Sequence, residues 1–245
     1  MFILINKDET IDDLQCEGYR IIQKKSGFRF GMDAVLLANF AKIKKNDIVL
    51  DIGTGTGIIP LLLCAKTPAK NIVGIEIQDE LVEMAKRSVS LNNAKERLEI
   101  LKVDVKDLDF FKKTSFDVVT ANPPYFKFED GIRNINFKKD ISRHEVLCTL
   151  DDFLVLASKV LKVGGKFFLV HKPERLADIL CSMRNLEIEP KYIRLVQPRA
   201  TSKPNIVLVS GTKKGGRELK VLPPLYVYDD KGNYTDELKL IYGKD

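Results

Sequence analysis

The chain of 245 residues contains no tryptophan, two histidines and four cysteines. The cysteines lie far apart, and none has the paired spacing of a zinc or redox site: Cys16, Cys64, Cys148 and Cys181. With His144 and His171 as the only histidines, a histidine metal site is not expected. We therefore expect no bound metal, and we interpret the cysteines as small apolar residues of a protein in a reducing cytoplasm.

Long apolar runs are also lacking. No run approaches the roughly 18 residues of a membrane-spanning helix. The apolar start at residues 1–5 passes at once into Asn6-Lys7-Asp8-Glu9, which is too short and too acidic for a signal peptide. We expect a cytoplasmic protein without a membrane partner. With 44% hydrophobic residues, one domain can form, with an extension at 1–45, a core at 46–210 and a tail at 211–245 packed on the core.

A glycine-rich turn is the clearest motif in the chain. The apolar run from Ile48 to Ile52 predicts a buried strand, and helical spacing resumes from Ile58 to Ala65. Between them, Gly53, Gly55 and Gly57 let the backbone turn sharply and approach a ligand closely. This arrangement is typical of a nucleotide-type cofactor site at the carboxyl end of the first strand of an open α/β sheet. The alternative is a purely structural turn capped by Asp51.

Acidic residues indicate which cofactor the turn would bind. Asp51 would repel the pyrophosphate of a dinucleotide, whereas it would favour the sulfonium and ammonium cations of S-adenosylmethionine (SAM). The next apolar run ends in Glu76, where a ribose hydroxyl pair would be held, and a third ends in Asp104, placed to accept from an adenine amino group. Each acid alone is more often a solvated residue, but three at successive strand ends favour SAM as the cofactor.

This pattern resembles the class I SAM-dependent methyltransferases from Asp47 to about Ser210. Alternating strand and helix patterns predict an α/β fold with a mostly parallel sheet. The resemblance implies a Rossmann-like sheet of seven strands that ends in an antiparallel hairpin, built from 192–196 and 206–210, and a short N-terminal extension.

Three local features complete the prediction. A helix is expected at 33–41, and a short helix near 108–111. The loop at 27–31, with Phe30 and Gly31, is expected to fold over the cofactor.

The strand predicted at 116–121 ends in Asn122-Pro123-Pro124-Tyr125. The prolines restrict the backbone, so the Asn122 side-chain oxygen and the Pro123 carbonyl can both accept from one exocyclic amino group. These hydrogen bonds would orient the nitrogen lone pair towards the methyl donor and stabilise the developing positive charge. Tyr125 offers a ring on which a planar target can stack. The motif is shared by enzymes that methylate adenine N6, glutamine amide nitrogen and, in variant form, guanine N2.

Basic residues suggest an RNA partner. Residues 190–220 hold eight Lys or Arg against one acid, a net charge of +7, which we interpret as a footprint for a polyanion. A merely soluble surface is the alternative. The loop at 127–148 is rich in charge, and we interpret it as a lid over the target base. A plain disordered loop is the other interpretation.

Four segments resemble the bacterial tRNA1(Val) adenine-N6 methyltransferase family: residues 30–38, 122–126, 143–145 and 223–228. The resemblance implies SAM-dependent methylation of adenine N6 in RNA, at the anticodon-loop adenine of tRNA(Val). Methylation of a protein glutamine is an alternative, disfavoured by the basic segment and by the lack of a long N-terminal helical domain. An rRNA base is another. A catalytically silent SAM-fold module that binds RNA is disfavoured by the intact set of acids and Asn122.

Overall fold

The computed structural model describes residues 5–26, 31–111, 116–125 and 148–243. The expected cofactor contact of Phe30 lies outside these residues. So does the expected lid at 127–148, except for Cys148.

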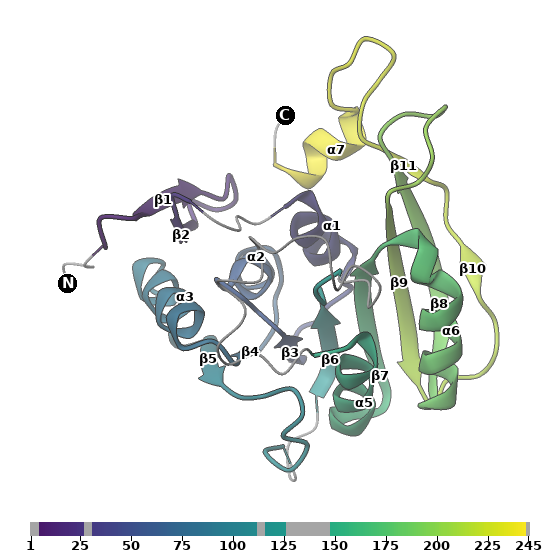
Figure 1. Cartoon of the computed structure of the whole chain (residues 1–245), viewed down its shortest axis with the longest axis horizontal. Helices are drawn as coiled ribbons and strands as arrows, with labels where there is room; N and C mark the ends of the chain where they lie inside the picture. The colour runs from purple at the N-terminus through teal and green to yellow at the C-terminus, as the bar shows by residue number, and fades with distance from the viewer. Residues whose placement is uncertain (1–4, 27–30, 112–115, 126–147, 244–245) are drawn as a thin grey trace, which may run out of the picture.

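A single large sheet forms the centre of the molecule (Figure 1). Its strands lie in the order β8-β9-β7-β6-β3-β4-β5. Their bounds are β3 Ile48–Ile52, β4 Asn71–Glu76, β5 Leu98–Lys102, β6 Phe116–Ala121, β7 Leu161–His171, β8 Ile188–Gln197 and β9 Ile206–Lys213. Among these seven, β9 alone runs antiparallel to its neighbours β7 and β8. The predicted parallel sheet with an antiparallel hairpin is confirmed.

The tail extends this sheet to nine strands. Two short strands, β10 (Lys220–Val221) and β11 (Leu225–Tyr226), pair parallel with β8. The last helix, α7 (Asp236–Ile241), begins where the Thr235 hydroxyl accepts from the Leu238 backbone N–H. Leu225, Leu238 and Ile241 are buried in the same hydrophobic cluster as the core helices, so the tail packs on one face of the sheet.

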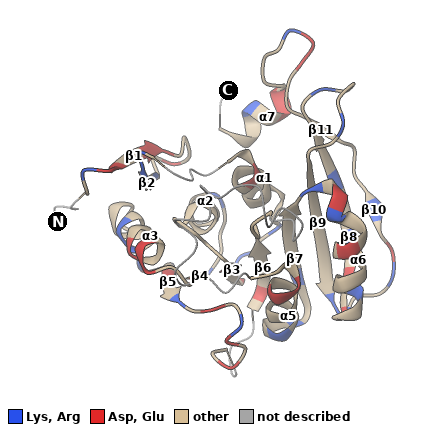
Figure 2. Ribbon diagram, in the orientation of Figure 1, with Lys and Arg blue, Asp and Glu red and all other residues tan. Residues whose placement is uncertain are grey.

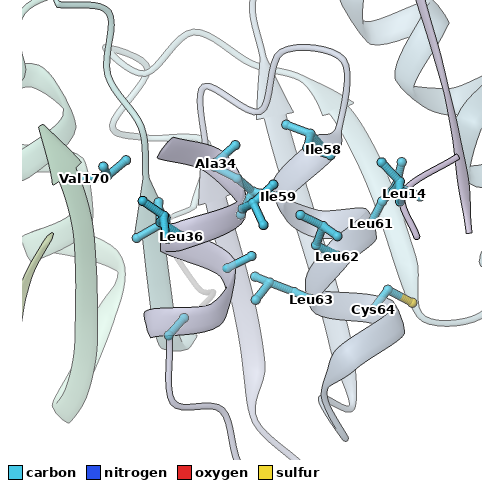
Figure 3. Packing of buried hydrophobic residues seen from close by; sticks show 14 of the residues in the cluster. Leu14, Ala34, Leu36, Ile58, Ile59, Leu61, Leu62, Leu63, Cys64 and Val170 are labelled. Carbon is cyan, nitrogen blue, oxygen red and sulfur yellow. The ribbon is translucent and has the colours of Figure 1, made fainter. Parts of the chain in front are cut away.

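Helices cover both faces of the sheet. The first face carries α1 (Met32–Phe40), α2 (Ile58–Lys66) and α3 (Asp79–Leu91), and the second carries α5 (Leu150–Val160) and α6 (Leu176–Asn185), which follows a short 3-10 turn at Pro173–Arg175 (Figure 1). The strands are apolar on both sides, because Val118 faces the first cluster and Val119 the second. Figure 3 shows apolar side chains of α1 and α2 directed towards each other.

The N-terminal extension forms a hairpin of β1 (Glu9–Asp13) and β2 (Arg20–Lys24) that packs on α3. The Ile22 N–H donates to the buried Ser88 hydroxyl at 3.0 Å, and Arg87 pairs with Glu9 at 2.6 Å. The Arg87 guanidinium lowers the pKa of Glu9 to about 2, against the effect of burial.

One predicted element is wrong. Residues 108–111 form a turn instead of a short helix. The reason is local, because the carboxylates of Asp104 and Asp107 accept from backbone N–H groups two residues ahead and stabilise turns in place of a helix. Phe111 is nevertheless buried, edge-on to Phe116. In the described part of the chain, no helix combines the length and apolar character that crossing a membrane requires.

Candidate active site

The strand register brings the expected site residues to one edge of the sheet. Ile52 at the end of β3 lies opposite both Ile75 of β4 and Ala121 of β6, and Glu76 lies opposite Lys102 of β5. The glycine turn, Glu76, Asp104 and Asn122 therefore follow adjacent strand ends. We refer to this side as the site edge.

The backbone of the glycine turn adopts a conformation that residues with a side chain rarely adopt. Gly53, Gly55 and Gly57 all have positive φ, at 69°, 57° and 88°. A Cβ on Gly53 would come within 2.9 Å of the Phe153 ring. A Cβ on Gly55 would meet no atom within 4 Å, so the backbone there borders open space that a ligand can approach. Gly57 directly precedes the first residue of α2.

Asp51 is fully buried between β4 and β6. Its Oδ1 accepts from the Thr120 hydroxyl at 2.6 Å, a partner that the sequence did not indicate. Its Oδ2 and the nearby Thr54 hydroxyl form no hydrogen bond of good geometry with any described residue, although that hydroxyl is close enough to favour the charged form of Asp51. Burial raises the pKa of Asp51 to about 7, although the Thr120 hydrogen bond favours the charged form. A buried carboxylate oxygen without a partner is suited to a cationic ligand.

Glu76 connects the glycine turn to α3. Its Oε2 accepts from the Gly55 N–H at 3.0 Å, and its Oε1 accepts from the N–H groups of Ile77 and Gln78 at 2.9 and 3.0 Å. The side chain is 7% exposed. Glu76 therefore holds the turn in place as well as standing where ribose hydroxyl groups are expected.

Asp104 is the least buried of the three acids. It is half-buried two residues after the end of β5, and its Oδ1 accepts from the Lys106 N–H at 2.9 Å. Gly31, which was expected near the cofactor, precedes the first residue of α1.

The Asn-Pro-Pro-Tyr turn is held by a residue whose role sequence reasoning missed. The Asn122 Nδ2 donates to Asp33 Oδ2 at 3.3 Å, and the Tyr125 hydroxyl donates to the same oxygen at 2.8 Å. The Tyr125 hydroxyl also lies 2.9 Å from Asn122 Oδ1. Asp33 stands in the first turn of α1, where the sequence indicated only a helix start. The family resemblance of residues 30–38, which include Asp33, was a signal that could have found it.

Two further residues from the end of β7 surround Tyr125. The His171 ring meets the Tyr125 ring edge-on, with 5.1 Å between centroids, and the Lys172 ammonium lies 5.2 Å from the centre of the Tyr125 ring. Burial, followed by the charge of Asp33, raises the pKa of Tyr125. Burial, followed by the charge of Arg175, lowers the pKa of His171 to about 4, so this ring is neutral at pH 7.

The basic segment 190–220 does not form one footprint. β8 and β9 fold it into a hairpin, so basic residues lie at both ends of the pair (Figure 2). Lys213 is buried and donates to the Ser158 hydroxyl and the Leu186 carbonyl, so its role is structural. Lys214 pairs with Glu187 at the same end, opposite the site edge. Only the loop 198–205 carries its cations to the site edge.

The arrangement provides acceptors for cations and hydroxyl groups around an open glycine turn, next to an amide that can bind an amino group. These groups fit SAM. Within the described ranges, no cluster of three or more His, Cys, Asp or Glu side chains is placed to hold a metal ion.

Comparisons with known proteins agree with this chemistry. The family described as "Methyltransferase domain" matches residues 43–218. A protein of Bacteroides thetaiotaomicron, named tRNA1(Val) (adenine(37)-N6)-methyltransferase, is 33% identical over 67% of this chain and 68% of its own length. A protein of the same name from Porphyromonas gingivalis is 29% identical over 90% and 84%. A crystal structure from Agrobacterium tumefaciens, described as a predicted O-methyltransferase, is similar in fold, with a TM-score of 0.69 and 22% identity over 87% and 97% of the two chains.

Proposed function

Because this chain belongs to the methyltransferase-domain family and, within it, to the tRNA1(Val) (adenine(37)-N6)-methyltransferases, we propose that it methylates adenine N6 in the anticodon loop of tRNA(Val). The observation that carries the proposal is the fixed orientation of the Asn122 amide at the site edge. An acceptor pair that binds one planar amino group needs such an orientation.

SAM supplies the methyl group on a positively charged sulfur. Asp51, Glu76 and Asp104 would hold it, and the backbone of Gly53, Gly55 and Gly57 would lie against it. The partnerless oxygen of Asp51 suits a cationic group, and Glu76 and Asp104 suit hydroxyl and amino donors.

Asp33 determines which atom of the Asn122 amide faces the substrate. An ionised carboxylate can only accept hydrogen bonds, so the amide must turn its Nδ2 towards Asp33. Asn122 Oδ1 is then fixed as an acceptor. Together with the Pro123 carbonyl, it can accept both hydrogens of an adenine amino group and leave the nitrogen lone pair free for the methyl group.

When the base enters, the Tyr125 hydroxyl can no longer donate to Asn122 Oδ1. Its hydroxyl has one hydrogen and two possible acceptors, Asp33 Oδ2 and Asn122 Oδ1. When the amino group of the base occupies Asn122 Oδ1, the phenol keeps its bond to Asp33. The ring therefore stays fixed beside the base, which has left its stack in the RNA loop. No strong general base is required, because the proton can leave the nitrogen after methyl transfer.

The test is to incubate the protein with labelled SAM and unmodified total tRNA, digest the RNA and identify the labelled nucleoside. We expect N6-methyladenosine, and sequencing of the labelled species should place it next to the anticodon of tRNA(Val). Label in another nucleoside, or label only in protein glutamine when a release factor is offered, would contradict the proposal.

A further inference from the structure

The C-terminal tail reaches the site edge. β11 pairs in parallel with the end of β8, with Leu225 opposite Val196 and Tyr226 opposite Gln197. Just beyond this pair, the Tyr228 N–H donates to the Pro198 carbonyl at 2.9 Å. The end of β8 pairs with the start of β9, which in turn lies opposite His171 at the end of β7. The tail and the loop 198–205 therefore lie on the same side of the sheet as the Asn122 turn (Figure 1).

Tyrosine rings follow one another along this tail. The rings of Tyr228 and Tyr234 have centroids 5.5 Å apart, and those of Tyr234 and Tyr242 are stacked at 6.0 Å. At the inner end, Tyr242 is near enough to Asp33 for that charge to help raise its pKa to about 12, after the larger effects of burial and Tyr234. At the outer end, Tyr226 and Tyr228 are each 36% exposed. The rings thus extend from the site outwards into solvent.

Two cations of the loop 198–205 lack acidic partners. Arg199 and Lys203 are both exposed in the loop 198–205, and neither forms an ion pair with any residue that the structure describes. The Arg199 guanidinium lies against Gly232, in the turn between Tyr228 and Tyr234. That turn contains two acids. The Asp229 carboxylate accepts from the Lys231 and Asn233 N–H groups, and the exposed Asp230 forms no ion pair with Arg199.

Three other cations of the hairpin and tail have partners nearby. Lys214 pairs with Glu187 at the end of the sheet opposite the site edge, Lys220 pairs with Glu218 beside the middle of β8, and the Lys191 ammonium donates to the Gly216 carbonyl. Exposed rings and cations without an acidic partner thus occur together at the site edge. Tyr192 and Arg217 are also exposed, and Arg217 forms no ion pair with a described residue, so the first group differs by its position beside the Asn122 turn. Rings that can stack on bases and cations that can contact phosphates are the two components of a surface for single-stranded nucleic acid.

From this juxtaposition we infer that Tyr226, Tyr228, Arg199 and Lys203 form a binding surface for the single-stranded RNA loop that carries the target adenine. The inference rests on the proposed function and extends it. β8 lies three strands from β6, a separation of about 14 Å, so this surface contacts nucleotides a few positions from the base at Asn122. The exposed rings stack on bases of the loop, and the two cations contact its phosphates.

The test compares charge reversal on and off the proposed surface. The double variant R199E/K203E alters the proposed surface, and K214E/K220E makes the same charge change at two lysines of the segment 190–220 outside it. Binding of an unmodified tRNA(Val) transcript is measured by fluorescence anisotropy over a range of salt concentrations. We expect R199E/K203E to weaken binding at least about tenfold and to reduce the log–log salt slope by about 1.4, for two lost phosphate contacts. K214E/K220E should stay within about twofold of wild type.

A second pair of variants tests stacking. Tyr226→Ala removes an exposed ring and should weaken binding about fivefold or more, whereas Tyr226→Phe keeps the ring and should bind like wild type. Unfolding temperature and SAM affinity should be unchanged in all four variants. Equal binding by R199E/K203E and wild type, or an equal loss in K214E/K220E, would overturn the inference. Methyl transfer to total tRNA by the wild-type protein, measured in parallel, reports on the proposed function alone.

Discussion

Asp33 and Asn122, 89 residues apart in the chain, lie within hydrogen-bond distance at 3.3 Å. The contact joins the first turn of α1, before the cofactor strand, to the turn that follows β6. α1 therefore does more than pack on the sheet, since its Asp33 fixes the amide that we propose binds the substrate.

Replacement of Asp33 by Asn should lower the rate of methyl transfer with little effect on the affinity for SAM. An amide at position 33 can donate as well as accept, so it no longer forces the orientation of Asn122. We expect kcat to fall about 10- to 100-fold, while the Kd for SAM changes less than about twofold. Asp109→Asn, at an acid whose side chain is 70% exposed, is the matched control. If D33N lowers the unfolding temperature and SAM affinity but leaves kcat unchanged, Asp33 only supports the fold.

Asn122→Ala should remove catalysis while the cofactor still binds. Loss of one oriented polar contact to the reacting group costs roughly two to three orders of magnitude in rate. Asn122→Asp should fail as well, because it would place a second carboxylate beside Asp33. The measurements are single-turnover transfer to tRNA and calorimetric SAM binding, with the exposed Asn39→Ala as control. Near-wild-type transfer by N122A would exclude the amino-orienting role.

Glu76→Ala should weaken the binding of SAM and also destabilise the protein. The SAM affinity should fall by about 1–3 kcal/mol, through loss of charge-assisted hydrogen bonds to hydroxyl groups. Three backbone N–H groups lose their acceptor in the same variant, so Tm should decrease by about 3–10 °C. Glu83→Ala, at an exposed position of α3, serves as control for both measurements. Unchanged SAM affinity in E76A would contradict its assignment.

The buried Asp51 should make SAM binding depend on pH. Its pKa is about 7 in the folded protein against an ordinary 3.8, so the folded chain retains a proton that the unfolded chain loses. The contribution of Asp51 to stability is therefore greatest below about pH 4 and is lost as the pH rises towards about 7. A cationic ligand favours the carboxylate, so SAM affinity should fall roughly tenfold between about pH 7.5 and about pH 6, with proton release on binding.

Calorimetry in buffers of different ionisation enthalpy measures that proton release. Asp51→Asn cannot titrate and should bind SAM more weakly, with no pH dependence over the same range. A pH dependence that persists in D51N would assign the titration to another group.

Sequence patterns predicted the features that depend on neighbouring residues. The strand at 116–121 was predicted with its bounds, because an apolar run buried on both faces has few alternatives. The glycine turn was equally evident, since three positive-φ positions in five residues leave little choice of residue type. The family suggested by the motifs is confirmed. The roles of the individual cofactor positions stay predictions.

The features that sequence analysis missed depend on distant residues. Thr120 faces Asp51 because β6 pairs with β3, and no local pattern distinguishes it from any other buried threonine. The division of the basic segment was missed for a related reason, while its contact with RNA stays a prediction. A run of cations in the sequence becomes two separate groups once β8 and β9 reverse direction, about 25 Å apart for strands of this length.

The ammonium of Lys66, at the end of α2, donates to the carbonyl of Ile241 at 2.6 Å. The helix that follows the glycine turn is thus tied to nearly the last described residue of the chain. A nascent polypeptide that already contains the glycine turn and Asn122 still lacks this contact, the apolar cover from α7 and the rings beside Asp33. During translation, α2 and the core beneath it therefore gain these contacts only after α7 has been synthesised.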